Sequence, residues 1–242
     1  MKIHTAERLA AILAIGIFAY GVPCGTWVAT AAESENSLWL NSFQETSQGN
    51  VIMGNPDAPV KLIEYASYTC GHCAAFEATE APQLEKDKVA DGSVSFEMRS
   101  LIRDPIDLTL AMLARCGGKD RFFGNHRFLM ASQSAILQKT SAITAPTADK
   151  LKTRDFSGFM TGIYDDMKLG EWMQQRGISD DQARKCLTNE TTINQLLTIT
   201  AAAGPTYNIQ GTPSFIINEK LAAGAHDYNS LKPLLIAPVA VK

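Results

Sequence analysis

The strongest constraint on the fold is a pair of cysteines that lies where one local pattern gives way to another. The stretch EYASYTCGHCAAFEAT begins at Glu64, and its Cys70 and Cys73 enclose only a glycine and a histidine. Before the pair, VKLIEYASY is rich in β-branched and aromatic residues, which is typical of a strand. After the pair, apolar residues recur at close to helical spacing. The sequence therefore predicts a CxxC motif at a strand-to-helix junction.

Such a pair can bind a metal, staple a loop or exchange electrons. A zinc site needs about four ligands, commonly in two pairs, whereas Cys116 and Cys186 stand alone in this chain. A disulfide between residues three apart closes a very short loop, so its entropic benefit is small. A thiol at a helix N-terminus is stabilised as a thiolate by free N–H groups and the helix dipole. We therefore expect no metal, with Cys70 as a redox nucleophile that His72 helps to activate and Cys73 as the resolving thiol.

The first 31 residues have the three-part pattern of a secretory signal peptide. A basic start precedes the apolar run LAAILAIGIFAYGV, and the small residues ATA follow as a cleavage site. The apolar run has about 14 residues, against the roughly 20 that span a bilayer. We therefore expect cleavage after residue 31 and a location in the periplasm; an uncleaved membrane anchor is the alternative.

Composition narrows the classes of partner. The formal net charge of −3 provides no basic surface for nucleic acid. The chain has no glycine-rich phosphate loop or nucleotide motif, so we expect no cofactor. Loss of residues 1–31 leaves four cysteines, and an even number in an exported chain favours disulfides. Four cysteines allow three pairings, and the sequence alone does not choose among them.

The rest of the chain reads as an α/β unit that a helical segment interrupts. The helix after the CxxC motif contains Pro82, which should kink it, and Asp107 is a good cap for the next helix. Near the C-terminus, GTPSFIIN returns to β structure. We expect five segments, namely a signal peptide (1–31), a leader (32–50), a first α/β part (51–104), a helical insertion (105–204) and a second α/β part (205–242).

This organisation resembles the DsbA-like branch of the thioredoxin superfamily, a group of thiol–disulfide oxidoreductases. The resemblance rests on GNPDAPVKLIEYASYTCGHC and GTPSFIIN and covers about residues 51–240. It implies a thioredoxin fold with a large helical insertion. It also implies a monomeric enzyme that donates a disulfide to unfolded, thiol-containing proteins and that a membrane quinone-linked partner reoxidises.

The resemblance also implies roles for particular residues. Thr212 and Pro213 take the place of the segment, with a cis proline, that packs beside the active disulfide and binds substrate. Glu64 stands where relatives carry a buried acid beneath the resolving cysteine. Burial would raise the pKa of this carboxyl and let it move the proton of Cys73; an exposed strand glutamate is the alternative.

Two further points follow from the resemblance. Some relatives have a second disulfide, which implies a bond between Cys116 and Cys186, with two buried free thiols as the alternative. The dipeptide inside the CxxC motif is Gly-His, as in protein disulfide isomerase, whereas the best-known periplasmic oxidase has Pro-His. This departure leaves a disulfide isomerase or reductase as the second candidate function, and a binding or chaperone module on the same scaffold as the third.

Overall fold

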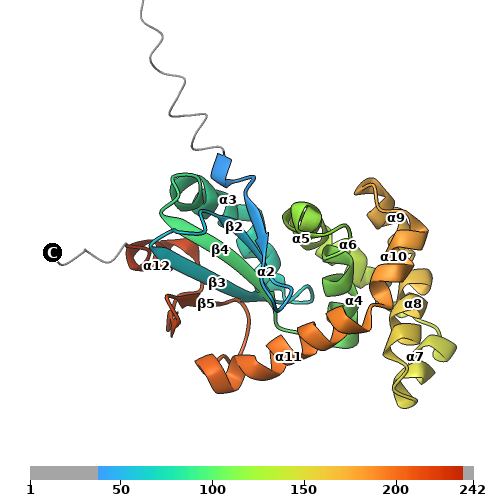
Figure 1. The fold of residues 1–242 in the computed structure, drawn as a ribbon. Helices are drawn as coiled ribbons and strands as arrows, with labels where there is room; N and C mark the ends of the chain where they lie inside the picture. Colours follow the sequence, from blue (N-terminus) through green and yellow to red (C-terminus); the bar gives the residue numbers. More distant parts are fainter. Residues whose placement is uncertain (1–37, 237–242) are drawn as a thin grey trace, which may run out of the picture.

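The computed structural model describes residues 38–236, so the expected signal peptide lies outside the described part of the chain. A six-stranded sheet stands beside a group of helices in Figure 1. The strand order is β1-β2-β4-β3-β5-β6. Only β3 and β4 pair in parallel, and the other neighbours are antiparallel. The strands are β1 (Phe43–Glu45), β2 (Val51–Gly54), β3 (Val60–Ala66), β4 (Val94–Ser100), β5 (Ser214–Ile217) and β6 (Lys220–Leu221).

The helices form two groups. Those of the sheet unit are α2 (Gly71–Thr79), α3 (Ala81–Leu84), the π-helix η1 (Glu85–Val89), α12 (Tyr228–Leu231) and the 3₁₀ helix η3 (Lys232–Leu234). Those between β4 and β5 are α4 (Pro105–Ala114), α5 (Lys119–Ala131), α6 (Gln133–Leu137), the 3₁₀ helix η2 (Gln138–Ala142), α7 (Ala145–Lys152), α8 (Phe156–Asp166), α9 (Leu169–Gln175), α10 (Asp180–Leu187) and α11 (Glu190–Tyr207). This order confirms the expected α/β class with a large helical insertion. Within residues 38–236, no helix is both long and apolar enough for a bilayer.

The central strand β3 separates two apolar clusters because its successive side chains point to opposite faces of the sheet. On one face, Leu62 packs in the main core together with Phe76 of α2. On the other face, Tyr65 packs in a smaller cluster with Ile199 of α11. Glu64 has the same parity as Leu62 and therefore points towards α2, the helix that the CxxC motif begins.

Two expected helix details differ in the structure. Pro82 does not kink one helix but lies in the first turn of a new one, α3, where its missing N–H group leaves no gap in the hydrogen bonding. Asp107 does not cap α4. Asp104 is the cap, and its Oδ1 accepts a 2.9 Å hydrogen bond from the N–H group of Asp107. The side chain of Asp107 is instead fully buried.

The expected leader is in part a strand. Residues Phe43–Glu45 pair with β2 as the edge strand β1. Phe43 stacks on Phe123 of α5, with ring centroids 5.9 Å apart. This contact ties the segment before the α/β unit to the insertion, so the leader contributes to the folded structure rather than only preceding it.

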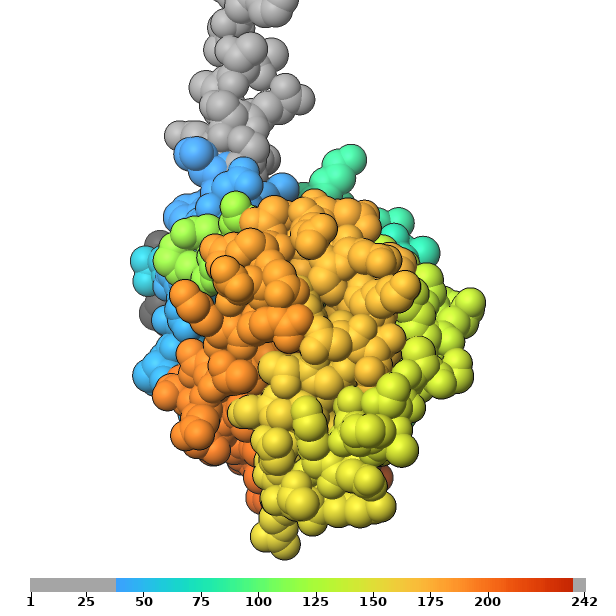
Figure 2. Space-filling model, turned by 90° about the vertical axis from the view of Figure 1, so that its right-hand side faces the viewer, coloured from blue at the N-terminus to red at the C-terminus, as the bar shows by residue number. Residues whose placement is uncertain are grey.

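The insertion carries its own crosslink. Cys116, just after α4, is bonded to Cys186 of α10 across a sequence separation of 70 residues. Helices α7 to α10 form the yellow and orange face of the molecule in Figure 2. The bond therefore joins the first helix of the insertion to one that reaches this outer face.

Replacing both residues, as Cys116→Ala/Cys186→Ala, should lower the free energy of unfolding by about 2–4 kcal/mol, because chain entropy assigns roughly 4 kcal/mol to a loop of this length. Urea unfolding of the oxidised protein measures the change, with Cys70→Ala/Cys73→Ala as the matched control that opens only a very short loop. Two alkylatable thiols at positions 116 and 186 in the oxidised wild type would contradict the bond.

Candidate functional site

Cys70 lies at the junction that the sequence predicts. It is the N-cap residue of α2, with extended backbone angles (φ −98°, ψ 114°) and no side-chain cap of its own. Its thiol donates a 3.2 Å hydrogen bond to the carbonyl oxygen of Thr212. The peptide bond between Thr212 and Pro213 is cis. The resemblance implies that the Thr212–Pro213 segment packs beside the CxxC motif. The structure places Thr212 against Cys70, although the two residues are 142 positions apart in the sequence.

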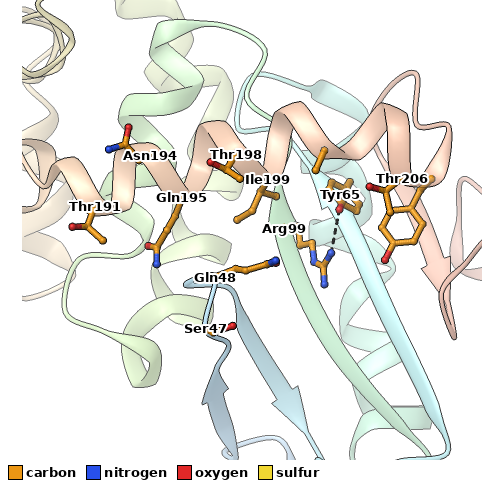
Figure 3. Close-up of a pocket in the computed structure, with 12 residues that line it drawn as sticks. Ser47, Gln48, Tyr65, Arg99, Thr191, Asn194, Gln195, Thr198, Ile199 and Thr206 are labelled. Carbon is orange, nitrogen blue, oxygen red and sulfur yellow. Dashed lines mark hydrogen bonds between the residues drawn. The ribbon is translucent and has the colours of Figure 1, made fainter.

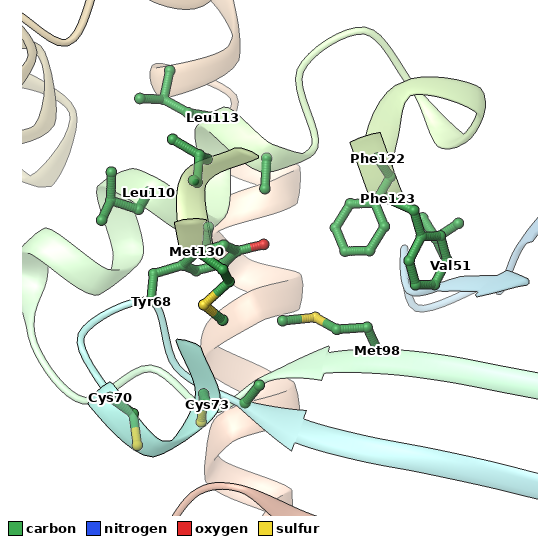
Figure 4. Packing of buried hydrophobic residues seen from close by; sticks show 14 of the residues in the cluster. Val51, Tyr68, Cys70, Cys73, Met98, Leu110, Leu113, Phe122, Phe123 and Met130 are labelled. Atoms are coloured by element: carbon green, nitrogen blue, oxygen red, sulfur yellow. The ribbon is translucent and has the colours of Figure 1, made fainter. Parts of the chain in front are cut away.

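The two thiols differ in their surroundings. Both are free, and Figure 4 shows Cys70 at the tip of the loop and Cys73 closer to the end of β3. Both residues are buried, Cys70 with 5% and Cys73 with 1% of its surface exposed. Cys70 nevertheless lines an open pocket of about 360 Å³ together with His72 and Thr212, and Cys73 does not line it. A substrate can therefore reach the thiol of Cys70 through the pocket, whereas Cys73 can attack only from inside.

The pKa of Cys70 is lowered although burial of the thiol acts to raise it. Hydrogen bonds from the side chain of Thr212, from Cys73 and from the backbone N–H group of His72 outweigh the loss of water. These donors stabilise the thiolate at the start of α2, which is the arrangement that activates a cysteine. The imidazole of His72 is exposed and lines the same pocket.

The pKa values of Cys73 and Glu64 are raised instead. For both groups burial is the main cause, and mutual repulsion between the two as anions adds to the shift of Cys73. Glu64 pairs across the sheet with Met98 and Phe215, so its carboxyl lies among apolar side chains. Within residues 38–236 its Oε2 has no hydrogen-bond partner. A protonated carboxyl and a protonated thiol are therefore favoured beneath the nucleophile.

The insertion holds the loop that precedes Cys70. The buried carboxylate of Asp107 accepts hydrogen bonds from the hydroxyl of Ser67 (2.6 Å) and the N–H group of Tyr68 (2.7 Å). Asp104 accepts a third from the hydroxyl of Thr69 (2.7 Å). Burial raises the pKa of Asp107 to about 6, and the donated hydrogen bonds oppose the shift. Asp107 of α4 and the cap residue Asp104 thus accept one hydrogen bond from each of the three loop residues.

Gln133 takes up the acceptors of the same loop. Its amide nitrogen donates to the carbonyl oxygens of Tyr68 (3.0 Å) and Cys70 (2.9 Å). Gln133 begins α6 and is buried. Because amide nitrogen atoms donate two hydrogen bonds, one side chain satisfies both carbonyl groups. The backbone of the nucleophile is therefore held by the insertion as well as by α2.

A buried polar chain runs behind the active helix. Tyr68 reaches into the apolar cluster that also holds Met130 (Figure 4). Its hydroxyl lies 2.9 Å from Nδ1 of His126. The other ring nitrogen of His126 lies 3.3 Å from a carboxylate oxygen of Glu77, which follows Cys73 by one turn of α2. This chain links the dithiol helix to α5 of the insertion.

A larger cavity of about 540 Å³ lies elsewhere, between α11 and the sheet (Figure 3). There Arg99 donates a 3.2 Å hydrogen bond to the hydroxyl of Tyr65, and Gln195 lines the opposite end. Tyr65 points to the face of β3 away from Glu64, and neither cysteine of the CxxC motif lines the cavity. Size therefore does not identify the reactive site of this protein.

In residues 38–236 no three His, Cys, Asp or Glu side chains are grouped so that they could hold a metal ion. The sequence-predicted residues Cys70, Cys73, Glu64 and Thr212 do meet, through the contacts and the electrostatic coupling given above.

The residues of the insertion that hold the loop were not foreseen. Asp104 had a signal, because the Pro105 that follows it favours the first helical position and marks the preceding residue as a cap. His126 and Gln133 are two helical turns apart among Phe122 and other apolar residues. Polar side chains at that spacing on a buried face indicate specific partners.

Comparisons with known proteins agree on the fold. A family model described as Thioredoxin matches residues 46–236. The crystal structure of a protein-disulfide isomerase from Novosphingobium aromaticivorans is 35% identical, with a TM-score of 0.70, and the match covers 76% of this chain and 94% of that one. Alpha-DsbA1 of Wolbachia pipientis, 19% identical, matches in fold with a TM-score of 0.61 over 83% of this chain and 94% of its own.

A curated relative from Rickettsia conorii, provisionally named a protein-disulfide oxidoreductase, is 27% identical over 72% of this chain and 55% of its own length. The chain therefore spans about half of that relative.

The opposite pKa shifts can be measured. In the reduced protein, one thiol should titrate below the free value of about 8.5, and its thiolate absorbance near 240 nm should disappear in Cys70→Ala but persist in Cys73→Ala. Because the folded pKa of Cys70 is lowered, the thiolate stabilises the reduced protein above about pH 8.5, and this stability is lost as the pH falls through the folded value. A Cys70 that titrates like a free thiol would rule out activation.

Gln133→Met removes both donors while keeping the length of the side chain. The carbonyl oxygens of Tyr68 and Cys70 then lose the hydrogen bond from Gln133. The carbonyl oxygen of Cys70 still accepts one from the N–H group of Ala74. Unfolding in urea should show a loss of about 1–3 kcal/mol, and the pKa of Cys70 should move towards the free value. The matched control, Gln83→Met on an exposed position of α3, should change neither quantity. If Gln133→Met is as stable as the wild type, the hydrogen bonds of Gln133 do not stabilise the loop before Cys70.

Proposed function

This chain belongs to the thioredoxin family, and from that premise we propose that it is an exported thiol–disulfide oxidoreductase of the DsbA type that donates the Cys70–Cys73 disulfide to folding proteins. The observation that carries the proposal is the asymmetry of the two thiols. Cys70 lines an open pocket and its pKa is lowered, whereas Cys73 is buried above Glu64 and its pKa is raised. A metal ligand pair or a structural staple needs no such difference.

The first half of the reaction begins with the oxidised motif. A substrate thiolate attacks Sγ of Cys70, the bond between Cys70 and Cys73 breaks, and Cys73 leaves with the electron pair. Because its pKa is raised, Cys73 takes up a proton readily, and the protonated carboxyl of Glu64, which is electrostatically coupled to Cys73, is the proposed source. Glu64 then regains a proton before the next cycle.

In the second half, another thiolate of the substrate attacks the substrate sulfur of the mixed disulfide. A disulfide forms in the substrate, and Cys70 leaves as a thiolate. The donors from Thr212 and from the backbone of His72 and Cys73 stabilise this leaving group. A thiol of low pKa leaves faster and favours the reduced form, so the same contacts make the motif a stronger oxidant.

Substrate binding is proposed at the segment before β5. The pocket of Cys70 and a second groove of about 400 Å³ share Gln210, Gly211 and Thr212, so they lie on either side of one loop. An extended peptide could pair with the backbone at Thr212 and bring its thiol to Cys70. Backbone pairing suits unfolded proteins of varied sequence, because it does not depend on their side chains.

Two further parts of the proposal rest on the N-terminal sequence pattern and on the resemblance, respectively. The first 31 residues support export to the periplasm, where disulfides persist. A membrane quinone-linked partner would accept the two electrons from the reduced motif and restore the disulfide. No cofactor of its own is needed for either half of the reaction.

Disulfide isomerisation is the second candidate function. The Gly-His dipeptide and the similarity to the protein-disulfide isomerase of Novosphingobium aromaticivorans favour it. An isomerase must hold a misfolded substrate while its bonds reshuffle, and the resemblance implies a cleft between two protomers for that task. If the protein is an oxidase, as we propose, it is a monomer and its helical insertion borders the active site instead.

Two assays on the mature protein, recovered from a periplasmic extract, separate these functions. Oxidation of a reduced two-cysteine peptide should be fast, and recovery of scrambled ribonuclease should be weak. Cys70→Ser should abolish both, and the Cys116→Ala/Cys186→Ala variant is the control that retains the motif. A stable dimer with strong isomerase activity and slow peptide oxidation would favour the second candidate. Recovery only as a membrane-bound chain that starts at Met1 would contradict cleavage after residue 31 and favour the uncleaved anchor.

A further inference from the structure

An arginine lies in the pocket of the nucleophile. Arg103 follows β4 and lines the 360 Å³ pocket together with Cys70, His72 and the Gln210–Thr212 loop. Its side chain is exposed. Arg103 is therefore placed to contact whatever approaches Cys70.

The guanidinium of Arg103 has no role in holding the fold. Within residues 38–236 only its backbone N–H group is engaged, in a 3.0 Å hydrogen bond to Oδ2 of Asp107. The side chain makes no hydrogen bond or ion pair with the described residues. Most other arginines of the described part have such a bond, for example Arg99 with Glu97 and Arg127 with Glu77. The backbone bond fixes where the side chain starts and leaves its charge free.

The pocket itself has no carboxylate. Its titratable groups are Cys70, His72 and Arg103. The neighbouring acids face other partners: Asp104 accepts from Thr69, and Asp107 accepts from the loop before Cys70. A pocket whose fixed charge is positive raises the local concentration of anions, and low-dielectric walls strengthen the effect.

We propose that Arg103 makes this site selective for anionic reaction partners, namely cysteines flanked by aspartate or glutamate in an unfolded chain. The inference rests on the proposed function and adds the charge of the preferred substrate to it. Backbone pairing at Thr212 does not distinguish side chains, so a discriminating contact must come from a side chain of the pocket. Arg103 can form a two-pronged hydrogen bond with a carboxylate, which a lysine cannot.

The selectivity is testable with small disulfides of matched shape. Reduced Cys70 attacks such a disulfide as a thiolate, forms a mixed disulfide and releases one thiolate; Cys73 then attacks and releases the other, so two electrons pass to the reagent. Dithiodipropionate, hydroxyethyl disulfide and cystamine share one skeleton and carry negative, neutral and positive ends. Dividing each rate by the rate with the neutral reagent removes differences in intrinsic thiol reactivity.

For Arg103→Gln, the relative rate with dithiodipropionate should fall roughly threefold to tenfold, and that with cystamine should rise, as expected for loss of one nearby charge. Arg103→Lys keeps the charge but not the two-pronged hydrogen bond, so its relative rate with dithiodipropionate should lie between those of Arg103→Gln and the wild type. The matched control is Lys185→Gln, at an exposed position of α10 outside the pocket. It should resemble the wild type. In high salt the wild-type preference should shrink, because the screening length drops to about 3 Å at 1 M.

Equal relative rates in the wild type, Arg103→Gln and Lys185→Gln would overturn the inference and leave the proposed function standing. The proposed function fails independently if peptides are not oxidised, because a reduced thiol reacts with small disulfides in either case. A parallel measurement uses two peptides that differ only in Asp or Lys beside the cysteine. The wild type should prefer the Asp peptide, and Arg103→Gln should lose that preference; no preference in the wild type would also overturn the inference.

Discussion

The position of Cys70 depends on hydrogen bonds that reach its loop from outside the sheet unit. Asp104 and Asp107 bind the donors of Ser67 to Thr69, and Gln133 binds the carbonyl oxygens of Tyr68 and Cys70. A loop held by these five hydrogen bonds has fewer alternative conformations, so Cys70 stays beside Thr212 and at the start of α2. The lowered pKa of Cys70 and its access from the pocket follow from that placement. The insertion is therefore part of the active site although it supplies neither thiol.

Two buried carboxyl groups near this loop show how surroundings separate roles. Asp107 accepts three hydrogen bonds, from Ser67, Tyr68 and Arg103, and its pKa rises only to about 6. Glu64 lies between Met98 and Phe215, and its Oε2 has no donor in the described part of the chain. A buried acid without donors is costly as an anion and therefore stays protonated. Asp107 thus suits a structural acceptor, whereas Glu64 suits a group that holds and passes a proton.

The sequence predicts those parts of the molecule that depend on local patterns. Cys70 at a strand-to-helix junction follows from two periodicities and a CxxC spacing, and the helical insertion follows from its amphipathic runs. The contact with Thr212 required a family resemblance, because it joins residues 142 positions apart. Gln133 could not be predicted, since its partners are carbonyl groups of a loop more than 60 residues away. Strand β1 was missed because its three residues, FQE, carry no alternating pattern and pair only once β2 is present.

The separation of the two halves of the site has a consequence for biosynthesis. The chain emerges from its N-terminus, so Cys70 and Cys73 appear long before α6 can supply Gln133, and Thr212 emerges only after the whole insertion. Until then Cys70 lacks the hydrogen bond from Thr212 and the loop contacts with Asp104, Asp107 and Gln133, although the donors of His72 and Cys73 are already present. Cys116 likewise precedes its partner Cys186 by 70 residues. The complete environment of the nucleophile therefore exists only after the last third of the chain has been made.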